Sequence, residues 1–169
     1  MKKQNIWGNF NKLINSDISI KDFEEWIYTD KTIEKIIGKD NYVTLVSMNY
    51  TKSDSKEKVQ KYLVELFESL EPELYDKYRV YNILKGMLDG QKDLVSGCRR
   101  LVQLRKRGLE FIPKIFVGFD SELDDVPLPE QYSQWNKNAL GEKLKKIDYY
   151  REDIIKYSKK LIKELDIRK

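Results

Sequence analysis

The chain has 169 residues, of which 36% are charged and 12% are aromatic, and its formal net charge is +4. A chain of this length can bury about 70% of its unfolded surface, so it can fold without a disulfide or a structural metal ion. It contains no histidine and a single cysteine, Cys98. This composition excludes Ser-His-Asp and Cys-His catalysis, histidine-ligated metal sites and a disulfide framework.

The first forty residues show the pattern of consecutive amphipathic helices. Apolar side chains recur at helical spacing over 6–14. Ser19 is a favourable N-cap and predicts the start of a second helix. Asp30 can cap a short third helix that ends at Gly38, and we expect Asp40 to cap the helix after it.

The run 42–48 is ambiguous because its β-branched residues favour a strand. No partner strand lies nearby, and an isolated strand leaves its backbone groups unpaired, so we predict a helix there. Ser53 or Asp54 then opens a clear amphipathic helix. Pro72 breaks that helix and occupies the first turn of the next one.

A helix is predicted over 92–107, ending at Gly108. The segment 109–130 holds three prolines and is the least regular part of the chain. A short helix from Pro113 fits its apolar spacing, and a short strand near 114–118 is the alternative. Farther on, Asn136 or Asn138 opens a long helix to about Leu165.

These elements predict an all-α fold, an irregular bundle of seven to nine helices. The connections between them are too short to mark a boundary, so we expect a single helical domain over 1–169. No apolar run reaches the roughly 20 residues that span a bilayer, and the N-terminus has no signal-peptide core. The expected location is therefore the cytoplasm.

Charge is concentrated in blocks in the second half of the chain. Residues 91–110 hold six basic and two acidic side chains, whereas 111–130 hold one and five. The acidic block contains four closely spaced carboxylates: Asp120, Glu122, Asp124 and Asp125. An EF-hand loop would need glycine at Asp125 and a glutamate at Gln131, so the calcium-loop pattern fails. We expect no metal ion and no other cofactor, and expect a basic group, either Arg99, Arg100 or Arg105 of this chain or one on a partner, to compensate this block.

The basic block gives the alternative site. Its cations could contact nucleic acid, although the end of a helix is also a favourable place for positive charge. The residues concerned are Arg99, Arg100, Arg105, Lys106 and Arg107. Tyr132 and Trp135 lie in a polar stretch after the acidic block, and exposed aromatic residues of this kind are common at the centre of protein interfaces.

Four short strings resemble sequences of small bacterial immunity proteins, which are encoded beside polymorphic or contact-dependent growth inhibition toxins. The strings are Asp22-Phe23-Glu24-Glu25-Trp26-Ile27-Tyr28, Ile33-Glu34-x-x-Ile37-Gly38-x-Asp40-x-Tyr42, Phe111-Ile112-Pro113 and Gly118-Phe119-x-Ser121-Glu122-x-Asp124-Asp125-x-Pro127. The resemblance implies a non-enzymatic inhibitor that binds the C-terminal domain of a cognate toxin and covers its active or substrate-binding surface. Inhibitors of nuclease toxins are often acidic overall, and this chain departs from that pattern because it is basic overall.

The sequence therefore predicts an immunity protein in a toxin-antitoxin pair, with a partner-binding surface at the acidic block, Tyr132 and Trp135. A helical nucleic-acid-binding protein that uses the basic block is the alternative. A metal-dependent hydrolase built on the acidic residues is a third hypothesis. Whether the chain is a monomer or a homodimer stays open.

Overall fold

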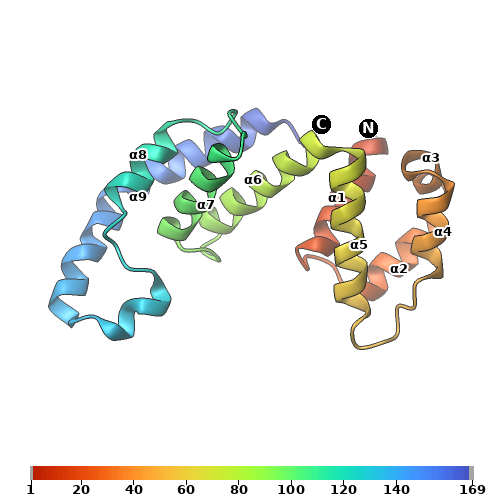
Figure 1. Cartoon of the computed structure of the whole chain (residues 1–169), viewed down its shortest axis with the longest axis horizontal. Coiled ribbons are helices and arrows are strands. Elements are labelled where there is room, and N and C mark those ends of the chain that lie inside the picture. The colour runs from red at the N-terminus through yellow and green to blue at the C-terminus, as the bar shows by residue number, and fades with distance from the viewer. Residues whose placement is uncertain (1, 168–169) are drawn as a thin grey trace. The chain divides into compact units, whose positions relative to one another are not determined.

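The computed structural model describes residues 2–167 and is helical throughout, as predicted from the sequence (Figure 1). Within this range it has nine α-helices and one 3-10 helix, and no strand. The helices are α1 (Lys2–Ile14), α2 (Ile20–Thr29), α3 (Ile33–Ile37), α4 (Lys39–Ser47), α5 (Ser55–Leu70), α6 (Pro72–Leu88), α7 (Leu94–Lys106), α8 (Ile115–Glu122), η1 (Pro129–Gln134) and α9 (Lys137–Leu165).

The two ambiguous segments are both helical. The run 42–48 lies almost wholly in α4, which confirms the helix prediction. The alternative strand near 114–118 is wrong, because α8 begins at Ile115 and its apolar residues follow helical spacing. Phe116 and Phe119 of α8 are buried, as a helix with one inward face requires.

Several helix ends follow the capping residues that the sequence offers. The Ser19 hydroxyl accepts a hydrogen bond from the Asp22 backbone N–H at 3.0 Å, and Asn136 accepts one from Asn138 at 2.9 Å. The prediction that Asp40 caps α4 is wrong. Gly38, with φ +85°, is the N-cap, and Asp40 lies in the first turn of the helix.

The contacts divide the chain into two compact units, and the division falls within α6. The first unit contains the residues up to Tyr78 together with Ile167, and the second contains 79–166. The prediction of a single domain over 1–169 remains a prediction.

The first unit is built around α1, which packs against α2 and α5, while α4 packs against α2 and α3. Its centre is aromatic. The Trp7 ring stacks on Phe67 with centroids 4.5 Å apart, and Phe10 meets Trp7 edge-on at 5.4 Å. All three side chains are fully buried, so this cluster forms the core of the unit.

The second unit holds α7, α8 and α9, each of which contacts the other two. Phe119 of α8 lies 6.1 Å from the rings of both Tyr150 and Tyr157 on α9. The apolar residues of α7 are buried, among them Cys98 and Leu101. This packing brings the end of α8, where the acidic block lies, next to α7 and α9.

Candidate protein-binding surface

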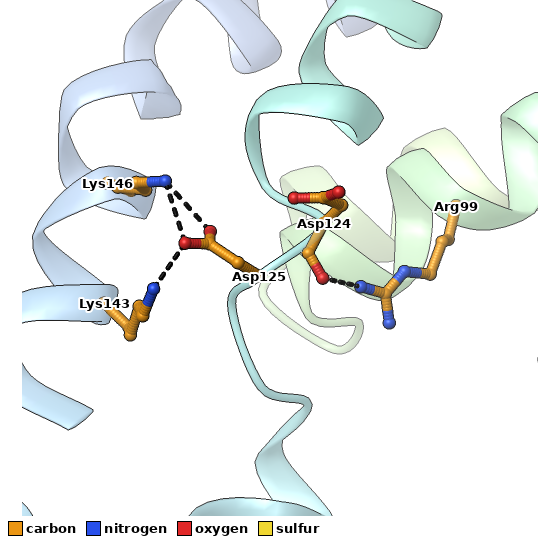
Figure 2. A network of polar contacts seen from close by, with 5 residues as sticks. All are labelled: Arg99, Asp124, Asp125, Lys143 and Lys146. Atoms are coloured by element: carbon orange, nitrogen blue, oxygen red, sulfur yellow. Dashed lines mark hydrogen bonds and ion pairs between the residues drawn. The ribbon is translucent and has the colours of Figure 1, made fainter. Parts of the chain in front are cut away.

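The four carboxylates predicted as a binding site, which we call the acidic turn (Asp120, Glu122, Asp124 and Asp125), occupy the last turn of α8 and the residues just after it. Asp125 points toward α9, where it forms ion pairs with Lys143 and Lys146 (Figure 2). Lys146 Nζ lies 2.9 and 3.1 Å from the two carboxylate oxygens. The hydrogen bond from Lys143, and after it the hydrogen bonds from Lys146, lower the pKa of Asp125 to about 2, because they favour the charged form of the carboxyl.

On its other side the acidic turn is held by Arg99 of α7. The guanidinium Nη2 donates a hydrogen bond to the Asp124 backbone carbonyl at 3.0 Å (Figure 2). The Nε of the same residue lies 3.8 Å from Asp120 Oδ1. Arg99 is thus one of the compensating cations predicted from the sequence. Lys143 and Lys146 were missed, and the only sequence signal for them is their i, i+3 spacing on one helix face.

Glu122 is also engaged within the chain. Glu122 lies near Tyr150 of α9, and the pKa of Tyr150 is raised first by desolvation and then by its interaction with this carboxylate. Within residues 2–167, the Asp124 carboxylate forms no ion pair and no side-chain hydrogen bond, because Arg99 binds the backbone carbonyl of this residue. The acidic turn therefore connects α7 to α9 through ion pairs and a hydrogen bond, and it leaves the Asp124 carboxylate unpaired at the surface.

The two aromatic residues predicted for this surface lie after the acidic turn in the chain, in η1 and at its end. Tyr132 is half-buried within η1, and Trp135, which ends that helix, is 37% exposed. The pKa of Tyr132 is raised by partial burial, with further contributions from the nearby charges of Asp93 and Glu130. The sequence placed these residues in a loop and did not predict the 3-10 helix.

The most exposed aromatic residue of the second unit is one that the sequence analysis missed. Tyr149 of α9 is 79% exposed, and its ring meets the Tyr150 ring edge-on at 4.8 Å. Since Glu122 lies near Tyr150, this ring contact places Tyr149 beside the acidic turn. The signal in the sequence is the Tyr-Tyr pair itself, because adjacent residues on a helix cannot both face the core.

Some side chains of the basic block form contacts within the chain, and the others are exposed to solvent. Arg99 holds the acidic turn, and Arg105 donates to the backbone carbonyls of Glu110, at 2.6 Å, and Ile112. Arg100, Lys106 and Arg107 are exposed. Of the five cations predicted to contact nucleic acid, two therefore stabilise loops of the second unit.

No family model, curated protein or solved structure matches this chain. In the part of the chain that the structure describes, no cluster of three or more potential ligand residues could hold a metal ion. None of the described helices combines the length and apolar character needed to cross a bilayer.

Proposed function

We propose that this chain is an immunity protein that binds a cognate toxin domain in the cytoplasm and covers its active or substrate-binding surface. The observation that carries the proposal is the pairing of Tyr149 with the acidic turn through Tyr150 and Glu122. Tyrosine is one of the residue types that are enriched among the energetically dominant contacts of protein interfaces. The four strings that resemble immunity proteins agree with this role.

The contacts that hold the acidic turn between two helices support the same function. The acidic turn is fixed by contacts to α7 on one side and to α9 on the other. A surface that is ordered before binding loses little conformational entropy when a partner docks, and this raises affinity. The unpaired Asp124 carboxylate adds negative charge to this surface, which would speed encounter with a basic toxin surface.

The alternative, nucleic-acid binding through the basic block, has less support. Arg99 and Arg105 are engaged inside the unit, which leaves three exposed cations on α7 and at its end. The acidic turn lies against the same helix and would repel phosphate groups.

The test is coexpression with the C-terminal domain of the toxin encoded next to this gene. We expect growth to be restored and the two proteins to copurify. If no neighbouring reading frame encodes a domain that stops growth, or if such a domain is neither neutralised nor bound, the proposal is overturned. Retention of single-stranded oligonucleotides with a steep salt dependence would instead favour the alternative.

A further inference from the structure

A second site lies in the second unit, where a pocket of about 380 Å³ opens beside the first turns of α7. Three cations line it: Lys92, Arg99 and Arg100. The lining also contains two acids, Asp93 and Glu130, and the apolar side chain of Leu128. This volume is at the lower end of the range for pockets that hold small organic ligands, about 300–1,000 Å³.

Lys92 is held in place at this pocket. Its backbone N–H donates to the Gly86 carbonyl at 2.9 Å, and its aliphatic stem lies against the same glycine. A Cβ at position 86 would come within 2.8 Å of Lys92 Cγ and Cδ, so only glycine leaves room for the stem. Holding a lysine side chain in one conformation costs conformational entropy, and a lysine that moves freely at the surface does not lose this entropy.

Lys92 and Arg100 line the same pocket. Partial burial and the nearby Arg100 guanidinium both lower the pKa of Lys92. Within residues 2–167, neither Lys92 nor Arg100 forms an ion pair. Two like charges held together at a pocket are stabilised by a dianion that contacts both.

The two acids of the lining restrict what that anion can be. The Asp93 carboxylate caps α7 by accepting from the Ser96 N–H at 2.9 Å, so it is engaged, whereas Glu130 is exposed. A polyphosphate chain would bring further negative charges close to both carboxylates. A small ligand with one phosphate group avoids this repulsion, and its hydroxyl groups could donate to Glu130.

From this geometry we propose that the pocket binds a small phosphate monoester, with the phosphate group between Lys92 and Arg100. Lys92 supplies a compact point charge, and Arg100 supplies a planar pair of donors suited to phosphate oxygens. The proposal does not depend on the immunity function, because it concerns the chain by itself.

The experiment is a titration of the full chain with glycerol 3-phosphate, followed by calorimetry and by amide chemical shifts. We expect saturable binding that shifts the resonances of 92–103. Lys92→Met keeps the stem and removes the charge, and Arg100→Gln removes the other cation. Each should weaken binding about tenfold or more, as expected for loss of a charge-assisted hydrogen bond. Lys106→Gln, an exposed cation of α7 outside the pocket, is the matched control and should bind normally.

Gly86→Ala tests the positioning of Lys92 without changing any charge. The added methyl group should displace the lysine stem and weaken binding, with the melting temperature followed to confirm folding. Absence of saturable binding, wild-type affinity in both charge variants, or an equal loss in Lys106→Gln would overturn the proposal. Equal affinity for inorganic phosphate would overturn the ester assignment, and displacement of the ester by a tighter-binding oligonucleotide would overturn the restriction to small ligands.

Discussion

Lys146 of α9 donates hydrogen bonds to both carboxylate oxygens of Asp125, at 2.9 and 3.1 Å, and so fixes the loop after α8 to the long C-terminal helix. Because the pKa of Asp125 falls from 3.8 to about 2 in the folded chain, this carboxyl takes up a proton on unfolding in that range. Its contribution to stability is complete above pH 3.8 and is lost as the pH falls through about 2.

Asp125→Asn should therefore reduce the dependence of the free energy of unfolding on pH between pH 3.8 and about pH 2. Denaturant unfolding at a series of acidic pH values measures this slope. The pair is solvent-exposed, so added salt should weaken the effect in the wild type. Asp148→Asn, which removes a pair internal to α9 with Arg151, is the control. An equal change of slope in both variants would contradict the assignment to Asp125.

Tyr149→Ala should weaken toxin binding by about 2 kcal/mol or more if the ring is a central contact of the interface. The free protein should keep its stability, because the side chain is 79% exposed. Calorimetry with an inactive toxin domain gives the affinity, and thermal unfolding gives the stability. Unchanged affinity would remove Tyr149 from the proposed interface.

Asp124→Lys should slow association with the toxin domain, because the unpaired carboxylate adds to the field of this surface. The fold should persist, since Arg99 binds the backbone carbonyl of Asp124 and not its side chain. Stopped-flow association at increasing salt measures the effect, which should shrink as salt rises. Glu65→Lys, an exposed charge reversal on α5, serves as control. Equal slowing in both variants would show only a dependence on net charge.

Gly97→Ala should destabilise the second unit by about 1–3 kcal/mol through overpacking. A Cβ at position 97 would lie 2.3 Å from Met87 Sδ, so the buried Met87 side chain, or the helices that carry the two residues, would have to shift. Met87→Ala in the same chain should recover part of the loss. Gly118→Ala in α8 meets nothing within 4 Å and should stabilise the protein by about 0.5–1 kcal/mol. Denaturant unfolding of the three variants and the wild type tests this contrast, which fails if the two glycine substitutions behave alike.

Cys98 should resist thiol reagents while the second unit is folded. The side chain is fully buried, and burial together with the nearby Asp120 and Asp93 charges raises its pKa to about 12. The reactive thiolate is therefore scarce at neutral pH, and the sulfur is shielded. Labelling by an aromatic disulfide reagent should follow unfolding as denaturant increases. Rapid, complete labelling of the native protein would contradict this arrangement.

Most of the fold could be predicted because helix starts and ends are local signals. Ser19 and Asn136 form cap hydrogen bonds that can be anticipated from a few neighbouring residues. The exception at Asp40 is also local. Gly38 ends α3 and begins α4 at once, which leaves no residue for a side-chain cap.

The candidate site could be predicted only in part, because its geometry depends on contacts between distant segments. The sequence indicates that the acidic turn needs a cation, and Arg99 provides one. It does not show that Lys143 and Lys146 lie opposite Asp125, since the position of α9 is determined by packing. Nor does it decide which of Tyr149 and Tyr150 faces outward, because that depends on the rotation of α9 against Phe119.

The placement of the three tryptophans gives each unit its own optical reporter. Trp7 and Trp26 belong to the first unit, where Trp7 is fully enclosed, whereas Trp135 of the second unit is 37% exposed. Blue-shifted emission therefore reports on Trp7 in the first unit, and Trp135 is the more exposed target for a quencher such as iodide. In a Trp135→Phe chain the remaining emission follows the first unit alone, so comparing its unfolding curve with the labelling of Cys98 in the second unit reveals whether the two units unfold together or in succession.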